Sequence, residues 1–198
     1  KSDVTVVNQP FDMSLLLNRE IDAAEAMTYN EYAQVLEAVN PKTGELYKPE
    51  DLNVINFNDV GTAMLQDGIF VRGDWIKDPA NQETAVKFLQ GAFKGWIYCR
   101  DNFDDAVAIV LKYGTTLLNE INKLIWPSAN GVGIMDPALY KQTADISQEF
   151  AVIKAAPKDG VYRTDLAQKA VDALKAAGVD VTGANYKPET VEITKGGE

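Results

Sequence analysis

Two loops near the beginning of the sequence combine aromatic rings with amide side chains, and that combination suits the binding of a small flat ligand. The first loop contains Asn8 and Phe11, and the second contains Tyr29, Asn30 and Tyr32. Aromatic rings stack on planar ligands at a low cost in side-chain entropy, while an asparagine both donates and accepts hydrogen bonds. The alternative interpretation is structural, because tyrosines at this spacing also pack one face of a helix. We predict that both loops contact a ligand.

A third loop, residues 126–131, places Trp126 and Asn130 between two predicted helices. A tryptophan in such a loop either lines a cleft or fills the interior of a domain, and the sequence leaves both interpretations open. Trp126 and Asn130 are therefore further candidate ligand contacts.

The residue types needed for several kinds of catalysis are absent or isolated. The sequence contains no histidine, which excludes a Ser-His-Asp triad, a Cys-His dyad and any histidine-ligated metal site within this chain. Cys99 is the single cysteine and is expected to be a structural thiol, while Asp104 and Asp105 are expected in the acidic first turn of a helix. No glycine-rich phosphate-binding pattern occurs. We therefore predict no catalytic residue, no metal, no cofactor and no enzymatic activity.

Charge and hydropathy exclude other classes of partner. The 198 residues include 19 basic and 29 acidic side chains, and the formal net charge is −10. Because no run of lysine or arginine interrupts this acidic balance, we do not expect nucleic acid or anionic membrane surfaces as partners. No apolar run approaches the roughly 18 residues that a membrane-spanning helix needs, so the chain is not expected to cross a membrane.

The elements that must position the first two loops have an alternating pattern. Short apolar segments precede each loop and helical patterns follow, which favours an α/β fold. From about residue 82 to residue 174 the pattern is almost entirely helical, and Asp136 followed by Pro137 is typical of a helix start. Strands are predicted at residues 4–7, 21–27, 52–57 and 68–71, and the later helices at 82–97, 103–113, 115–125, 136–155 and 164–178.

Several of these stretches resemble the NMT1/THI5-like substrate-binding proteins, which serve ABC importers. The resemblance lies in residues 11–17 (FDMSLLL), 20–24 (EIDAA) and 26–32 (AMTYNEY), and continues in residues 68–76 (GIFVRGDWI). Residues 102–106 (NFDDA) resemble the usual start of a helix in that family, with Phe103 in place of a proline.

The resemblance implies a periplasmic-binding-protein-like (type II) fold, with two α/β lobes and a ligand in the cleft between them. The abrupt start of the sequence suggests the C-terminal portion of such a protein, with a helix-rich second half. Residues 1–66 would then end the second lobe, residues 67–178 would form the return strand and the helical part of the first lobe, and residues 179–198 a C-terminal tail. The implied ligand contacts are Asn8, Phe11, Tyr29, Asn30, Tyr32, Thr62, Gln66, Trp126 and Asn130.

The resemblance also implies a function and a location. The chain would be the solute-binding component of an ABC importer, in contact with the transporter permease, and periplasmic or otherwise extracytoplasmic; a lipid anchor on the full-length protein is compatible with that location. The aromatic side chains favour a flat heterocycle, either a thiamine-precursor pyrimidine or a riboflavin-like molecule. The alternatives are a pyrimidine-synthesising enzyme of the THI5 type, a binder of sulfonate or nitrate, and a sensory domain fused to a signalling module. The arginines argue weakly against anionic ligands, because none lies in the three loops; they are Arg19, Arg72, Arg100 and Arg163.

Overall fold

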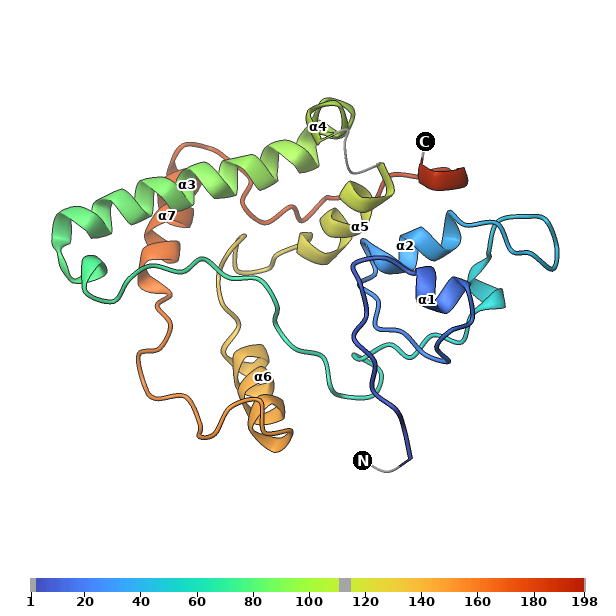
Figure 1. Ribbon diagram of the computed structural model, residues 1–198. Coiled ribbons are helices and arrows are strands. Elements are labelled where there is room, and N and C mark those ends of the chain that lie inside the picture. The colour runs from blue at the N-terminus through green and yellow to red at the C-terminus, as the bar shows by residue number, and fades with distance from the viewer. Residues whose placement is uncertain (1–2, 111–114, 198) are drawn as a thin grey trace. The chain divides into compact units, whose positions relative to one another are not determined.

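The computed structural model describes residues 3–110 and 115–197, and their regular secondary structure is helical (Figure 1). The α-helices are α1 (Ser14–Leu17), α2 (Glu31–Leu36), α3 (Pro79–Asp101), α4 (Phe103–Val110), α5 (Thr115–Ile125), α6 (Pro137–Glu149) and α7 (Asp165–Ala176). Short 3-10 helices are η1 (Pro49–Asp51), η2 (Trp75–Lys77) and η3 (Lys195–Gly197). The helix-rich second half is confirmed; the predicted end of the 103–113 helix, residues 111–113, lies outside the described residues.

The strand predictions at residues 4–7, 21–27, 52–57 and 68–71 are wrong for this structure. The β-pairing among the described residues is an isolated antiparallel bridge between Val39 and Leu46. A strand needs a neighbour to pair its N–H and C=O groups, and these segments run without one, so their apolar side chains remain in solvent. Val6 is 90% exposed and Phe70 is 88% exposed. The predicted α/β class is therefore not confirmed by the described part of the chain.

The chain divides into two compact units. Unit 1 consists of Lys1–Asn53, Cys99–Ile125 and Tyr186–Glu198, and unit 2 consists of Val54–Tyr98 and Trp126–Asn185. Helix α3 belongs mostly to unit 2, and only its last residues fall in unit 1.

Unit 1 is built around short helices whose ends are set by local hydrogen bonds. The Asp12 carboxylate accepts a hydrogen bond from the backbone N–H of Ser14, the first residue of α1, at 2.8 Å. At the other end of α1, Arg19 has φ of +61°, and its N–H and that of Glu20 bond back to the carbonyls of Leu16 and Leu15. This is the Schellman arrangement, in which glycine is the usual residue at the left-handed position. The buried apolar residues of the unit include Met13, Val35, Leu36 and Leu118.

Unit 2 has an apolar interior formed by one face of α7 and the loop after α5. Leu166, Ala170, Val171 and Leu174 of α7 are all buried, at the helical spacing expected of a core-facing side. The backbone of the 128–132 loop pairs with the segment after α7, through Ser128 N–H to Thr182 O at 2.8 Å and Val132 N–H to Val181 O at 2.9 Å.

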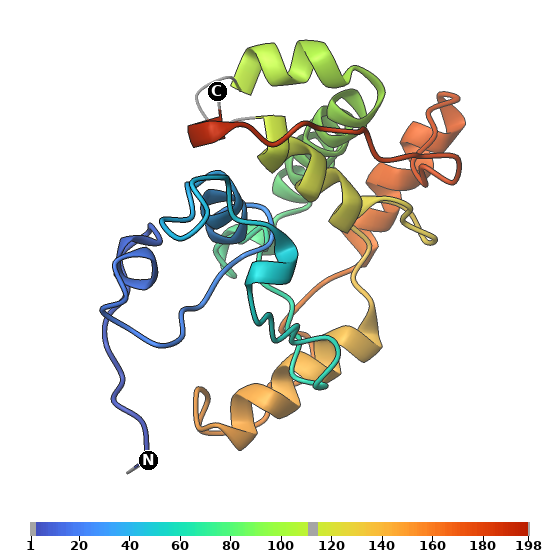
Figure 2. The same ribbon diagram turned by 90° about the vertical axis from the view of Figure 1, so that its right-hand side faces the viewer.

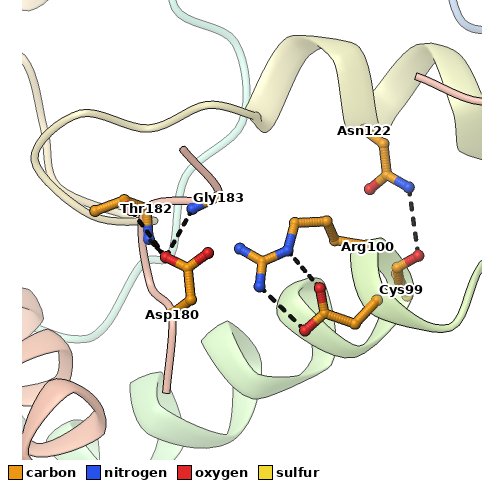
Figure 3. A network of polar contacts seen from close by, with 7 residues as sticks. Cys99, Arg100, Asn122, Asp180, Thr182 and Gly183 are labelled. Carbon is orange, nitrogen blue, oxygen red and sulfur yellow. Dashed lines mark hydrogen bonds and ion pairs between the residues drawn. The ribbon is translucent and has the colours of Figure 1, made fainter. Parts of the chain in front are cut away.

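A carboxylate fixes the turn that follows α7. Asp180 Oδ1 accepts hydrogen bonds from the backbone N–H groups of Thr182 and Gly183 and from the Thr182 hydroxyl, at 2.8 to 3.0 Å (Figure 3). The turn thereby holds Val181 and Thr182 ready for pairing with the 128–132 loop.

Helix α6 begins as the sequence predicts. The Asp136 carboxylate accepts the N–H groups of Ala138 and Leu139, and Pro137 occupies the first helical position. Two α6 side chains then bond to the backbone of an extended segment. Gln142 Nε2 donates to Ala63 O at 2.7 Å, and Thr143 Oγ1 accepts a hydrogen bond from the Leu65 N–H at 2.8 Å. Helix side chains thus supply backbone partners that a neighbouring strand would supply in a sheet.

Candidate ligand-binding site

The turn before α2 is closed by a buried carboxylate. Glu31, the first residue of α2, is only 8% exposed, and its Oε2 accepts the backbone N–H of Met27 at 3.0 Å. The carbonyl of Met27 in turn accepts the N–H groups of Asn30 and Tyr32, at 3.2 and 3.1 Å. A charged residue at the start of a short helix therefore folds the preceding turn back onto the helix.

A chain of side-chain amides continues from this carboxylate. Asn30 Nδ2 donates to Glu31 Oε1 at 3.1 Å, and Gln34 Nε2 donates to Asn30 Oδ1 at 3.0 Å. The series orients the Asn30 and Gln34 amides, because Glu31 Oε1 accepts a hydrogen bond from Asn30 and Asn30 Oδ1 accepts one from Gln34. The polar side chains of the turn are consequently held in one arrangement before any ligand arrives.

The buried Glu31 carboxylate has no cationic partner among residues 3–110 and 115–197. Two neutral donors, the Met27 N–H and the Asn30 amide, solvate Glu31. Each carboxylate oxygen can accept more than one hydrogen bond, so acceptor capacity remains. The electrostatic environment of the turn therefore favours a ligand that presents N–H donors or positive charge, and opposes an anion.

The two tyrosines of the turn keep part of their rings in solvent. Tyr29 and Tyr32 are each of intermediate exposure, and the Tyr29 hydroxyl lies 2.8 Å from the sulfur of Met27. Partly exposed rings beside a fixed hydrogen-bonding group provide both stacking surface and directional recognition.

Gln9 joins the first predicted loop to the second. Its amide pairs with the backbone of Glu25 in both directions, Nε2 to Glu25 O at 2.8 Å and Glu25 N–H to Oε1 at 3.0 Å. This contact brings the loop of Asn8 and Phe11 next to the segment that leads into the Tyr29 turn. Asn8 is exposed and Phe11 is 94% exposed, so both side chains are accessible.

Residues 1–106 match the family model described as NMT1/THI5 like. The chain belongs to the NMT1/THI5-like family. This family covers small-molecule substrate-binding proteins that have a periplasmic-binding-protein-like fold and are typically extracytoplasmic, and its THI5 members are enzymes. The match includes both loops of unit 1. No curated protein and no solved structure matches the chain.

The other predicted contacts of this NMT1/THI5-like chain lie in unit 2. Thr62 is half-buried, and its N–H bonds to Phe57 O at 2.9 Å, while Gln66 and Asn130 are exposed. Trp126 belongs to unit 2 and is only 3% exposed. This burial agrees with the interpretation that Trp126 fills the interior of a domain. Its contact with a ligand stays a prediction.

Three residues of the site, Gln9, Glu31 and Gln34, were not among the ligand contacts predicted from the sequence. Gln9 was not recognisable, because its backbone partner lies 16 residues away and no local pattern links them. Glu31 gave a weak signal, because an acidic residue is favoured in the first turn of a helix, and Gln34 gave none.

Three further features concern the described part of this NMT1/THI5-like chain. No cluster of three or more His, Cys, Asp or Glu side chains there could hold a metal ion. Burial raises the pKa of the Cys99 thiol, which keeps it protonated and weakly nucleophilic at neutral pH. None of the helices described is long and apolar enough to cross a membrane.

Unit 1 also has an open, acidic depression of about 400 Å³. It lies at the junction of α3, α4 and the C-terminal tail, and the first turn of α4 is acidic as predicted. The lining residues are Asp101, Asn102, Phe103, Asp104, Asp105 and Glu189.

Proposed function

We propose that this chain is the ligand-binding component of an ABC importer and that the turn before α2 holds a planar heterocycle bearing N–H groups. The observation that carries the proposal is the buried Glu31 carboxylate, hydrogen-bonded but unpaired with a cation in the described residues and flanked by Tyr29 and Tyr32. Family membership supports binding of a small molecule outside the cytoplasm.

A thiamine-precursor pyrimidine or a riboflavin-like ring matches this chemistry. An aminopyrimidine or an isoalloxazine offers N–H donors to Glu31, acceptors and donors to Asn30, and a flat face to the tyrosines. Sulfonate and nitrate offer only acceptors and negative charge, which the carboxylate repels. The geometry of the turn therefore favours the heterocycle over the anions.

The finer architecture is part of the same proposal. We propose the two-lobed α/β organisation of the family, with residues 1–66 in one lobe, residues 67–178 in the other and residues 179–198 as a tail. Thr62, Gln66, Trp126 and Asn130 would complete the cleft, and closure of the lobes about a hinge would retain the ligand for delivery to the permease.

Calorimetric titration with four probes tests the ligand class. The probes are 4-amino-5-hydroxymethyl-2-methylpyrimidine, riboflavin, taurine and nitrate. Binding of the pyrimidine or of riboflavin, without binding of taurine or nitrate, is the expected result. Binding of an anion alone would overturn the proposal, and so would chemical conversion of the pyrimidine detected by mass spectrometry, which would indicate the enzymatic branch.

Two substitutions test the turn itself. Glu31→Gln removes the charge and one acceptor, and is expected to weaken binding at least tenfold; Glu45→Gln, at an exposed position of the same unit, is the matched control. Tyr29→Ala is expected to cost about 1–3 kcal/mol of binding free energy, the range typical of a buried aromatic contact, whereas Tyr47→Ala serves as the tyrosine control. Circular dichroism verifies that each variant is folded. Unchanged affinity in both turn variants contradicts the assignment.

A further inference from the structure

The C-terminal tail, residues 186–197, is hydrogen-bonded to α5 through one buried asparagine. Asn119 is 3% exposed, and its side-chain amide pairs with the backbone of Glu189 in both directions, Nδ2 to Glu189 O at 3.0 Å and Glu189 N–H to Oδ1 at 3.1 Å. The amide group thus binds the tail as an adjacent strand would. A side chain in this position fixes both the location and the direction of the tail.

The far end of the same tail reaches α2. The N–H of Gly196, in η3, donates to the carbonyl of Glu37 at the C-terminal end of α2, at 3.1 Å. Figures 1 and 2 both show the tail, in red, running beside α5 and ending next to α2. One continuous segment therefore connects the helix that begins with Glu31 to α5.

We propose that residues 186–197 form a C-terminal strap that positions α2, and with it the Glu31 turn, against α5, and that Asn119 is the positioning residue of this strap. The consequence for ligand binding rests on the proposed function of the turn. The strap itself rests only on the contacts of Asn119 and Gly196.

The length of α2 explains why a strap matters. The helix has six residues, far fewer than the roughly 12–15 that an isolated helix needs to be even marginally stable in water. Its last carbonyls have no partner within the helix, and the Gly196 N–H satisfies the carbonyl of Glu37. A contact at the C-terminal end of so short an element also sets the position of its first residue, Glu31.

The phenol of Tyr186, at the start of the strap, is partly shielded from water. Burial raises the pKa of Tyr186, and the carboxylates of Glu189 and Glu120 raise it further. Glu120 belongs to α5 and follows Asn119, which bonds to the strap at Glu189. Release of the strap would return this phenol to solvent, which provides a spectroscopic signature.

Helix α5 also offers a matched control. Asn122 lies almost one turn beyond Asn119, is 0% exposed, and donates from Nδ2 to the carbonyl of Cys99 in α3 at 3.4 Å (Figure 3). It is a buried asparagine on the same helix, and its side-chain amide bonds to α3 instead of the strap. Substitution of Asn122 therefore reports what loss of a buried amide does without releasing the strap.

Hydrogen–deuterium exchange compares Asn119→Ala, Asn122→Ala and Gly196→Pro with the wild type. Asn119→Ala is expected to raise exchange at least tenfold in residues 186–193 and in α2, while α7 in unit 2 is unchanged. Gly196→Pro removes the N–H that bonds to Glu37 and also excludes the φ of +71° that Gly196 adopts, so it is expected to release the end of the strap and loosen α2 but not the contact of Glu189. Asn122→Ala is expected to affect α5 and the end of α3.

Equal loosening of the same segments by Asn119→Ala and Asn122→Ala would overturn the strap, as would unchanged exchange in α2.

Two further readouts separate positioning from simple stabilisation. Spectrophotometric titration, taken as the difference from a Tyr186→Phe background, is expected to show a lower pKa of Tyr186 in Asn119→Ala. Titration with the pyrimidine or riboflavin probe is expected to show binding weakened about fivefold or more in Asn119→Ala and unchanged in Asn122→Ala. Altered exchange with unchanged affinity would overturn the positioning role. Absence of binding in the wild type would instead contradict the proposed function, and exchange alone would then decide the strap.

Discussion

The turn at residues 27–32 in unit 1 and the loop at residues 126–133 in unit 2 have similar compositions and different structures. Both place aromatic and asparagine side chains beside helices. In the first, Tyr29 and Tyr32 remain partly exposed, and side-chain hydrogen bonds of Glu31 and Asn30 hold the turn. In the second, Trp126 is 3% exposed, and backbone bonds to residues 181–182 hold the loop.

The difference shows that the kind of interaction that holds a loop determines how much aromatic surface the loop leaves accessible to a ligand. Polar side chains that bond to one another fix a turn while its rings stay accessible. Apolar packing fixes the second loop by burying the Trp126 ring, which removes that stacking surface from water. Aromatic composition alone does not distinguish the two cases. Substitutions in unit 2 should therefore act mainly on stability, and substitutions in the turn mainly on binding.

The largest expected effect is on unit 2. Trp126→Ala is expected to lower the free energy of unfolding by about 3–5 kcal/mol, the range for removing a large buried side chain. Urea unfolding measures this, and the remaining tryptophans, Trp75 and Trp96, also lie in unit 2 and report on it. A loss below about 1 kcal/mol would show that Trp126 is not a core residue and would reopen its role as a ligand contact.

A pair of glycines separates packing from backbone strain. Gly133 and Gly160 have the same φ of +78°, but a Cβ at Gly133 would lie 2.1 Å from the ring of Phe93, whereas nothing lies within 4 Å at Gly160. Because Phe93 is buried, Gly133→Ala is expected to cost about 2–4 kcal/mol from overpacking and strain together, and Gly160→Ala about 1 kcal/mol from strain alone. Tryptophan fluorescence during urea unfolding measures both. Equal costs would show that Phe93 moves aside freely.

The contact that joins the two loops of unit 1 should be weaker. Gln9→Ala removes two exposed hydrogen bonds to Glu25 and is expected to cost about 0.5–1 kcal/mol of stability. Hydrogen–deuterium exchange over residues 8–13 and 25–27 is expected to rise, while Gln148→Ala, on the surface of α6, leaves those segments unchanged. Slow exchange retained in the Gln9 variant would mean that the loops are held by other contacts.

The smallest expected effects are stabilising and occur in both units. Arg19 at the end of α1 and Ala151 after α6 have φ of +61° and +59°, the left-handed conformation that Gly178 adopts after α7. Arg19→Gly and Ala151→Gly are each expected to add about 0.5–1 kcal/mol of stability, and Gly178→Ala to remove a similar amount. Thermal unfolding measures the three shifts, and destabilisation by either glycine would contradict the assigned helix ends.

The helices were largely predictable and the extended segments were not. Asp136 and Pro137 specify a helix start by chemistry that acts within a few residues, and the buried face of α7 follows from spacing alone. A short apolar run, as in residues 4–7, indicates only that the segment should be buried. Whether such a segment becomes a strand depends on a partner elsewhere, which local pattern does not encode.

The candidate site shows the same limit. The sequence predicts Tyr29, Asn30 and Tyr32 as ligand contacts, because it shows both their side-chain chemistry and their place at the start of a helix. The burial of the Glu31 carboxylate was not predictable, because it depends on the fold of the turn around it. Gln9 and Asn119 bond to backbone groups of distant residues, Glu25 and Glu189. The sequence does not distinguish these two amides from other polar side chains, because no local pattern marks which of them reaches a distant backbone group.

The exposed extended segments also govern how the protein behaves in concentrated solution. Val4 and Val6, and likewise Phe70 and Val71, present apolar side chains on unpaired backbone, the surface that promotes intermolecular β-association. The net charge of −10 opposes this by mutual repulsion between molecules. Salt at about 0.1 M shortens the range of that repulsion to about 10 Å. Colloidal stability therefore depends on ionic strength, and the protein keeps best in dilute buffer well above the pH at which its carboxylates become protonated.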